Sequence, residues 1–402
     1  ALQGMRFTDA YAAAPVCTPT RAAMMSGQAP ARLAITNHAP GNPDYVPEGS
    51  NLRGADWTTY LSLQHVTIAE RLKQAGYATG FVGKWHLSHR PGKDDRGPLE
   101  PRLRPEHQGF DMNVGGCRLG GPPSYFEPYK IPNITPRHDG DYLPDRLADE
   151  CLAFIRQHRD QPFLLSWWNY SVHYPIQAPE HLLKKYRARD GLENPDYAAM
   201  IEGMDTEIGR FLTALDDAGL RDKTLVIFKS DNGGYNGDNR PLRGFKGMLY
   251  EGGIRIPWIV RWPGRVEPGT TCATPVISMD CYPTLLQVAG LSPTPNHPVD
   301  GKNLSPLFEQ TSDLDRDAVY FHYPNYAFHK KNRLGGVIRE GDYKLIKRYG
   351  DNTLELYNLA EDIGEEKNLA IELTERARRL EHKLDTWLRE TGAKMPVTAK
   401  VE

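Results

Sequence analysis

The chain has 402 residues, of which 39% are hydrophobic and 25% are charged, values typical of a globular enzyme. Its 49 Lys and Arg residues against 51 Asp and Glu residues leave a net charge near zero, which excludes the basic footprint of a nucleic-acid-binding protein and an acidic tail. No apolar run approaches the ~20 residues that a membrane-spanning helix needs. We therefore expect no nucleic-acid partner and no membrane span, and the oligomeric state stays open.

The start of the chain predicts a missing segment. Residues 1–10 read as the end of a helix, a glycine stop and the beginning of a strand. A mature enzyme rarely begins inside such an element. We therefore expect an N-terminally truncated chain whose targeting segment lies outside the sequence, and a whole protein that is periplasmic or secreted.

Helix-like and strand-like stretches alternate up to about residue 290. The stretch 67–75 places apolar side chains on one helical face, and 77–82 then reads as a strand. The same order recurs at 145–159 with 162–168, and at 196–219 with 224–229. The last strand shows no polar alternation, as expected of a strand buried on both sides of a parallel sheet. This order predicts an α/β fold with a large, mixed, mostly parallel sheet flanked by helices.

The pattern changes after about residue 310. Short strands joined by turns are predicted at 318–323, 335–339, 343–348 and 354–359. Leu380, Leu384 and Leu388 have helical spacing, which predicts an amphipathic helix over 372–391. We therefore expect a catalytic α/β domain at 1–310, without its first strand, and a smaller C-terminal domain at 311–402 built from an antiparallel sheet and a helix.

The cysteines give little sign of a disulfide framework. There are five, at 17, 117, 151, 272 and 281, and no two of them form a Cys-x-x-Cys pair. Cys151 lies on an apolar helix face and is expected in the core. A bridge between Cys272 and Cys281 stays open.

The first chemical motif is Pro-Val-Cys-Thr-Pro-Thr-Arg-Ala-Ala-Met-Met-Ser-Gly at 15–27. Pro19 suits the first turn of a helix, and the residues after Arg21 continue it. Cys17 then lies at a helix N-terminus, where free N–H groups and the helix dipole attract an anion. Cys17 and Arg21 are four residues apart and can share one helix face. Taken alone, the motif also fits a buried structural cysteine before an ordinary helix.

Four further motifs follow predicted strands. Gly-Tyr-Ala-Thr-Gly-Phe-Val-Gly-Lys-Trp-His at 76–86 ends in Lys84 and His86, a point charge for an anion and a proton acceptor near neutral pH. His173 follows the strand that ends near 168, and Asp231 with Asn232 follows the strand that ends near 229. Lys246 lies in the stretch 242–263. Ligands bind at the carboxyl ends of strands in open α/β sheets, so these residues are candidates for one site. Individually, the Asp-Asn-Gly-Gly run also fits a plain turn, and Lys246 a solvated side chain.

In this order, the motifs resemble those of the formylglycine-dependent type I sulfatases, an arylsulfatase-like family of the alkaline phosphatase superfamily, and the chain is similar to bacterial members. The resemblance implies that a formylglycine-generating enzyme oxidises Cys17 to formylglycine, and that Asp231 and Asn232 hold a divalent metal, most simply Ca²⁺, through oxygen ligands. The family usually has Thr at the position of Ser26. Its members also carry two adjacent, metal-binding Asp residues at the end of a first strand, and neither that strand nor the Asp pair has a counterpart in this sequence. The implied catalytic residues are Cys17, Arg21, Lys84, His86, His173 and Lys246.

The mechanism implied by the resemblance uses a hydrated aldehyde. One hydroxyl of the diol attacks sulfur and the alcohol leaves, and the second hydroxyl then expels sulfate as the aldehyde reforms. His86 removes the second diol proton, and His173 with Lys246 assists departure of the alcohol. The metal and the cations neutralise the sulfate charge.

Two other functions remain open. A phosphonate or phosphate ester hydrolase of the same superfamily would use the same nucleophile, cations and metal, and an inactive binding protein on a sulfatase fold is a second alternative. Among sulfatase substrates we favour a sulfated carbohydrate over a small aryl sulfate. The segment 321–333 is rich in aromatic, His and basic groups, so His322 and His329 are candidate substrate contacts. Its alternative is tyrosine-rich packing between domains.

Overall fold

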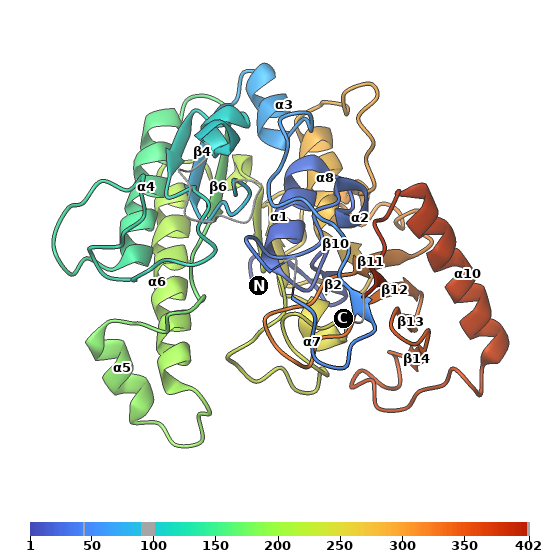
Figure 1. The fold of residues 1–402 in the computed structure, drawn as a ribbon. Helices are drawn as coiled ribbons and strands as arrows, with labels where there is room; N and C mark the ends of the chain where they lie inside the picture. The colour runs from blue at the N-terminus through green and yellow to red at the C-terminus, as the bar shows by residue number, and fades with distance from the viewer. Residues whose placement is uncertain (43–44, 90–100, 400–402) are drawn as a thin grey trace.

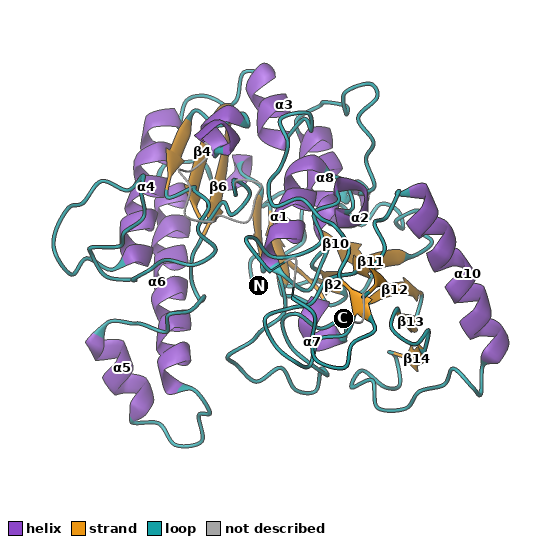
Figure 2. Cartoon of the chain, in the orientation of Figure 1, coloured by secondary structure: helices purple, strands orange, loops and turns teal. Residues whose placement is uncertain are grey.

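The computed structural model describes residues 1–42, 45–89 and 101–399. Figures 1 and 2 show helices α4, α5 and α6 at one side of the molecule, the C-terminal sheet with α10 at the other side, and α1 between them. The helices are α1 Cys17–Ser26, α2 Pro30–Leu33, α3 Ile68–Gln74, α4 Leu143–His158, α5 Glu180–Arg187, α6 Pro195–Asp217, α7 Glu251–Ile254, α8 Cys281–Val288, α9 Ser305–Phe308 and α10 Thr374–Glu390.

The first part of the chain builds a parallel sheet with strand order β5-β4-β6. Its strands are β5 Met112–Val114, β4 Ala78–Gly83 and β6 Phe163–Trp168. The predicted order of helix then strand is confirmed for α3 with β4, for α4 with β6, and for α6 with β7 Val226–Lys229. α3 begins where predicted because Thr67 and Glu70 form a reciprocal capping box.

A second, mixed sheet has the order β7-β8-β1-β9. Strand β8 (Trp258–Arg261) pairs antiparallel with both β7 and β1 (Met5–Phe7), and β1 pairs parallel with β9 (Thr271–Cys272). Two short pairs complete this region, β10 Val276–Ile277 with β2 Ala10–Tyr11 and β15 Val397–Thr398 with β3 Leu52–Arg53. The predicted α/β class is confirmed, and the main sheet is divided into a parallel and a mixed part.

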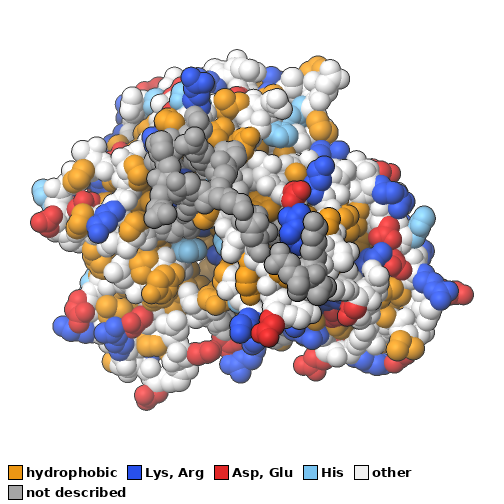
Figure 3. All heavy atoms as spheres, in the orientation of Figure 1, with side chains coloured by type: hydrophobic (Ala, Val, Ile, Leu, Met, Phe, Trp, Pro, Cys, Tyr) orange, Lys and Arg blue, Asp and Glu red, His pale blue; other side chains and the backbone are white. Residues whose placement is uncertain are grey.

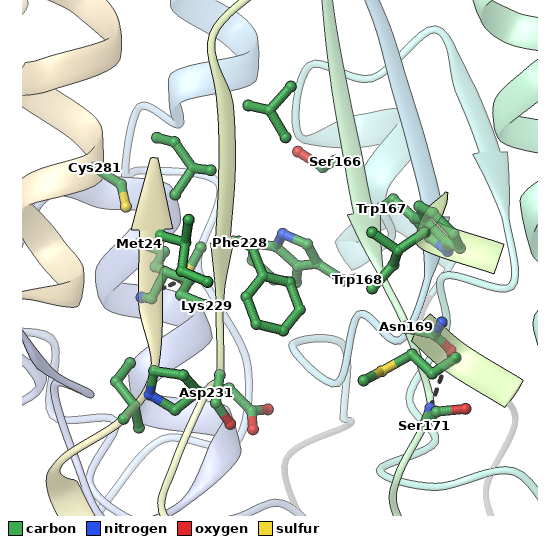
Figure 4. Close-up of a pocket in the computed structure, with 18 of the residues that line it drawn as sticks. Met24, Ser166, Trp167, Trp168, Asn169, Ser171, Phe228, Lys229, Asp231 and Cys281 are labelled. Carbon is green, nitrogen blue, oxygen red and sulfur yellow. Dashed lines mark hydrogen bonds between the residues drawn. The ribbon is translucent and has the colours of Figure 1, made fainter. Parts of the chain in front are cut away.

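A cavity of about 2530 Å³ separates the two parts of the main sheet. Strands β6 and β7 both line it, and within the described residues neither strand has a ladder partner on that side. Figure 4 shows Trp168 of β6 and Phe228 of β7 in the space between the two strands. All four residues of β7 are therefore only half-buried. The prediction that this strand is buried on both sides was wrong because one of its edges faces the cavity.

The C-terminal part folds as predicted into an antiparallel sheet of order β11-β12-β13-β14. Its strands are β11 Val319–Tyr323, β12 Gly335–Glu340, β13 Tyr343–Arg348 and β14 Leu354–Asn358. Gly341 forms the predicted turn with a φ of 56°, a left-handed conformation that favours glycine. The buried face of α10 packs on this sheet through the predicted leucines, Leu380, Leu384 and Leu388.

The two parts of the chain share one apolar cluster. Phe321 and Val337 of the C-terminal sheet lie in the same cluster as Tyr11, Ala13 and Val16, which lead into α1. The C-terminal sheet therefore supports the segment that places the first residue of α1. The boundary near residue 310 stays a prediction.

The remaining sequence expectations concern surface and cysteines. Within the described ranges, every helix is too short or too polar to span a bilayer. Charges of both signs are interspersed on the face shown in Figure 3. All five cysteines are free thiols, so the open question of a Cys272–Cys281 bridge is answered in the negative, and Cys151 is buried as expected.

Candidate active site

The site begins at the N-terminus of α1. Cys17 is the first residue of this helix and is buried. The residue before it, Val16, gives no side-chain cap, so the first-turn N–H groups are not used by a side chain at that position. α1 lies in the core with Ala22 and Ala23 fully buried, which holds the helix axis in place. The positive end of the helix dipole therefore acts on Cys17.

Three buried cations surround Cys17. Lys84 follows β4, and its N–H donates to the carbonyl oxygen of Trp168 at 2.7 Å, so the parallel pairing of β4 with β6 continues into the site. Lys246 lies in the loop after β7, and Arg21 lies one turn into α1. All three side chains line the cavity and are less than one-tenth exposed.

Arg21 connects the structural elements that surround Cys17. Its guanidinium donates to Asp231 Oδ2 at 2.7 Å and to the carbonyl of Lys84, and it lies 5.1 Å from the centre of the Trp168 ring. Ends of β4, β6, β7 and α1 are thereby joined by one side chain. The carboxyl ends of strands on both sides of the cavity meet here, as predicted from the motif positions.

The charges favour an anion at position 17. Burial raises the pKa of the Cys17 thiol, but Lys84 and Lys246 outweigh burial and bring the pKa to about 6. Burial lowers the pKa of Lys84 to about 8. Asp231 is the carboxylate among these charges; burial raises its pKa, yet Arg21 and Lys84 hold it well below its usual range. The electrostatic potential at Cys17 is therefore positive.

His86 faces the nucleophile position. Its Nδ1 lies 3.3 Å from Cys17 Sγ and 3.2 Å from Thr18 Oγ1, and its Nε2 contacts the carbonyl oxygen of Ala39. A carbonyl oxygen only accepts, so Nε2 carries the proton and the lone pair of Nδ1 faces Cys17 Sγ and Thr18 Oγ1. Burial and the charge of Lys84 lower the pKa of His86 well below its usual range. The ring is a neutral proton acceptor at pH 7.

His173 lines the same cavity from the loop after β6. Its Nδ1 donates to the carbonyl of Tyr174 at 3.0 Å, and burial together with Lys84 and Lys246 lowers its pKa to about 3. The sequence analysis missed the pair Gly120 and Gly121 beside these rings. A Cβ at Gly120 would lie 2.6 Å from the His86 ring, and one at Gly121 would lie 2.5 Å from His173 Nδ1. Only glycine permits this close approach.

Asp231 and Asn232 follow β7 and offer one carboxylate and one amide oxygen to a cation. Within the described residues, Asn232 Oδ1 is buried and has no hydrogen-bond partner, so it is an acceptor suited to a hard cation. Asp231 Oδ2 is held by Arg21. In residues 1–42, 45–89 and 101–399, no group of three or more His, Cys, Asp or Glu side chains has a metal-binding arrangement. The pair is thus a partial oxygen site.

His38 is a further site residue that sequence reasoning missed. It lines the cavity in the long loop that follows α2, and the charge of Cys17 acts on it. Burial lowers its pKa to about 4, and its ring contacts Phe328 edge-on with centroids 5.5 Å apart. The loop that carries His38 contains no recognisable motif, so the sequence indicated nothing about this residue beyond the unusual length of the loop.

The two substrate candidates from the C-terminal segment have other positions. His322 is 3% exposed and is not among the cavity residues; its Nδ1 pairs with the Tyr349 hydroxyl at 2.7 Å and its Nε2 with the Lys394 carbonyl at 2.9 Å. The expectation of a substrate contact at His322 was wrong because both ring nitrogens hold the domain together. His329 Nε2 donates to the carbonyl of Lys246 at 2.9 Å. His329 therefore positions a cation of the site, and its contact with substrate stays a prediction.

The cavity thus brings together a helix N-terminus at Cys17, three buried cations, a neutral imidazole and the side-chain oxygens of Asp231 and Asn232. Comparison with known proteins names the class. The family model described as Sulfatase matches residues 1–291, and the model described as N-sulphoglucosamine sulphohydrolase, C-terminal, matches residues 244–394. The chain belongs to the sulfatase family and is a sulfuric ester hydrolase.

Relatives cover most of the chain. It is 31% identical to a sulfatase of Formosa agariphila over all of this chain and 84% of that protein. It is 32% identical to human arylsulfatase A over 91% of this chain and 76% of the relative. Among solved structures, Ps i-CgsB in complex with k-i-k-neocarrahexaose aligns with a TM-score of 0.79 and 27% identity over 96% of this chain and 85% of that chain.

A more distant structure shares the fold alone. The phosphonate monoester hydrolase of Agrobacterium radiobacter aligns over all of this chain and 93% of its own, with a TM-score of 0.68 and 19% identity. The solved structures confirm the predicted fold, and the family model with the relatives confirms the predicted sulfatase activity. The role of each site residue stays a prediction.

Proposed function

We propose that the protein hydrolyses a sulfate monoester of a carbohydrate, with a formylglycine made from Cys17 as nucleophile and a divalent cation at Asp231 and Asn232. The observation that carries the proposal is the charge around position 17. Three buried cations meet one carboxylate there, and a negatively charged sulfate ester supplies the balance. Such preorganised charges stabilise a transition state without rearrangement.

The residues support a division of work. Lys84 and Lys246 lie on the nucleophile's side of the cavity and bind the sulfate oxygens, and Arg21 orients the nucleophile and Asp231 together. His86 has its unprotonated Nδ1 3.3 Å from Cys17 Sγ and takes the proton from the nucleophile. His173 is neutral in the absence of substrate, and the negative charge of a bound ester raises its pKa so that it can pass a proton to the leaving oxygen.

The two added groups fit the residues present. A formylglycine at the helix N-terminus supplies a hydrated aldehyde, which offers one hydroxyl for attack on sulfur and one for release of sulfate. The buried, unpartnered Oδ1 of Asn232 and the carboxylate of Asp231 would hold a Ca²⁺ ion, which supplies further positive charge at the site. Added Ca²⁺ should raise activity, and a chelator should lower it.

A carbohydrate substrate is supported by the cavity mouth and by the neighbours. Tyr235 and Phe328 are about half exposed, line the cavity and lie with ring centres 5.3 Å apart, so they offer an apolar surface for a sugar face. The neighbouring structure of Ps i-CgsB holds k-i-k-neocarrahexaose, and a fold neighbour, BT4656, holds D-glucosamine-2-N,6-O-disulfate. A periplasmic or secreted location remains part of the prediction.

Maturation tests the nucleophile. The protein is co-produced with a formylglycine-generating enzyme, and the peptide that contains Cys17 should lose mass in peptide mass spectrometry. Hydrolysis of an aryl sulfate and of a sulfated oligosaccharide should depend on this conversion. Full activity of unconverted protein or of Cys17→Ala would contradict the proposal. Cys281→Ala, which changes a buried cysteine outside the group around position 17, is the matched control.

The phosphate alternative is separated by paired substrates. The matured enzyme is given a sulfate ester, a phosphate ester and a phosphonate ester of the same alcohol. A kcat/KM that is highest for the sulfate ester supports the proposal. A higher value for either phosphorus ester would assign the site to the other activity of the superfamily.

A further inference from the structure

We infer that the protein binds a second anionic group of its substrate in a separate groove next to the active site, and therefore acts on carbohydrates that carry more than one sulfate or carboxylate. We call this hollow the cationic groove. It has a volume of about 310 Å³. Four of its lining residues are basic, Arg243, Lys331, Arg333 and Arg348, and Met248, Leu249 and Tyr250 form its apolar part. The inference rests on the proposed carbohydrate sulfatase activity.

The groove has an excess of positive charge. Arg348 is the least exposed of the four and is paired with Glu355 at 2.5 Å. Arg243, Lys331 and Arg333 are exposed, and in the part of the chain that the structure describes none of these three forms an ion pair with a carboxylate. The chain as a whole has a net charge of −2, so this excess is local. An anion from outside is the missing partner.

Two of the cations are held in fixed positions. The guanidinium carbons of Arg243 and Arg348 lie 4.0 and 5.0 Å from the centre of the Tyr250 ring. Arg243 also donates to the Tyr357 hydroxyl at 3.1 Å and to the Glu365 carbonyl at 2.7 Å. Both contacts leave its charge without a carboxylate. A preorganised guanidinium loses little conformational entropy when it binds an anion.

The groove adjoins the catalytic cavity. Lys246 of the active site and Met248 of the groove are two residues apart in one loop. The ring of Phe245 lies between the two: Lys331 Nζ is 5.6 Å from its centre, and the ring of Tyr235 in the cavity mouth is 5.5 Å from it. Phe328, which also lines the cavity, is three residues before Lys331. A chain that leaves the active site over Tyr235 and Phe328 reaches the groove next.

This arrangement selects a substrate class. An apolar ring face next to the scissile sulfate fits one sugar unit, and the cations beyond it fit an anionic substituent of a neighbouring unit. A singly sulfated sugar or a small aryl sulfate fills only the catalytic cavity. The groove therefore adds affinity for multiply charged chains and leaves the chemical step unchanged.

The test measures binding in a Cys17→Ala background, in which no formylglycine forms and no turnover occurs. The probes are a carrageenan tetrasaccharide with two sulfate esters and its singly sulfated counterpart, and the dissociation constants are measured by calorimetry. Lys331→Ala/Arg333→Ala should weaken binding of the doubly sulfated probe about tenfold, since two partly exposed charge contacts are lost. The same variant should change binding of the singly sulfated probe less than about twofold.

The control variant is Lys184→Ala/Arg378→Ala, which removes the same charge from exposed positions on α5 and α10. It should leave both dissociation constants unchanged. Equal losses of affinity for both probes, or an unchanged affinity for the doubly sulfated probe, would contradict the inference that the groove binds a second anionic group. Hydrolysis of the singly sulfated probe by the matured wild-type protein reports the proposed function independently, so a failure there is distinguished from a failure of the groove.

Discussion

Two buried clusters of charged side chains differ in whether the chain balances its own charges. Around Cys17, three cations meet one carboxylate. Between the main domain and the C-terminal sheet, three cations meet three carboxylates, in a group that we call the interdomain cluster. Its members are Arg255, Arg339, Lys344, Asp9, Glu251 and Glu365.

The difference separates structural from functional burial. In the interdomain cluster, Lys344 lies 2.9 Å from Glu251 and 2.8 Å from Glu365, and all three are fully buried. Burying a charge is unfavourable unless a partner compensates it, so this cluster is complete within the fold. Around Lys84 and Lys246 the cations outnumber the carboxylates, and under the proposed function a sulfate ester supplies the missing negative charge. An unbalanced buried cluster therefore marks where a ligand of opposite charge binds.

The largest effect on stability is expected in the complete cluster. Lys344→Met leaves the buried carboxylate of Glu365 without its cation and Glu251 with Arg255 alone, and it should lower the free energy of unfolding by about 3–5 kcal/mol. Lys383→Met, which breaks a partly exposed pair with Asp317 and Glu340, should cost about 1 kcal/mol or less. Chemical denaturation of both variants measures this, and kcat of the folded Lys344→Met protein should stay near the wild-type value. A similar loss in the two variants would contradict the comparison.

In the cluster around Cys17, loss of a cation should reduce the reaction rate and leave stability unchanged or higher. Lys84→Met and Lys246→Met remove charges that stabilise the transition state, typically worth about 3 kcal/mol or more, so kcat should fall roughly a hundredfold for every sulfate ester. Their unfolding temperature should be unchanged or higher than that of the wild type, because a buried cation next to other cations is removed. Steady-state kinetics with thermal denaturation gives both readings. Marked destabilisation with normal kcat would make these lysines structural.

The buried ring of His322, in strand β11 of the C-terminal sheet, predicts a pH dependence of stability. Burial lowers the pKa of His322 to about 4, while the unfolded chain takes up the proton near pH 6.5. Stability is therefore complete above pH 6.5 and falls as the pH decreases toward 4, by about 2 kcal/mol between pH 7 and pH 5. His322→Gln keeps a donor for the Lys394 carbonyl and an acceptor for the Tyr349 hydroxyl. It should remove this part of the pH-dependent loss of stability. Denaturation at the two pH values measures it, and an identical decrease in variant and wild type would exclude His322 as its source.

The smallest effect concerns Gly120 and Gly121, which make room for the rings of His86 and His173. Gly121→Ala should push His173 out of place and lower kcat/KM about tenfold, since small misplacements of a catalytic group reduce the rate. Gly209→Ala on α6 is the matched control, because no atom lies within 4 Å of its added methyl group. It should leave the rate unchanged and stabilise the helix by up to about 1 kcal/mol. Equal rates in the two variants would show that the glycine pair is not needed.

The sequence alone predicted much of the local structure. The apolar spacing of α3 and α10, the strand–turn–strand pattern around Gly341 and the helix N-terminus at Cys17 all depend on neighbours in the chain. The motif positions also indicated which residues would meet, because carboxyl ends of parallel strands share one edge. These features follow from short-range interactions, which a linear sequence displays directly.

Only the tertiary structure decided which charges are compensated and which rings face the site. Lys84 follows strand β4 and Lys344 lies within strand β13, yet it is Lys344 that is enclosed by the carboxylates of Glu251 and Glu365. The sequence analysis selected His322 and missed His38, but packing encloses the first between Tyr349 and Lys394 and places the second in the cavity. The energy of a buried charge or ring depends on neighbours from distant segments, and the sequence does not state which segments the fold brings together.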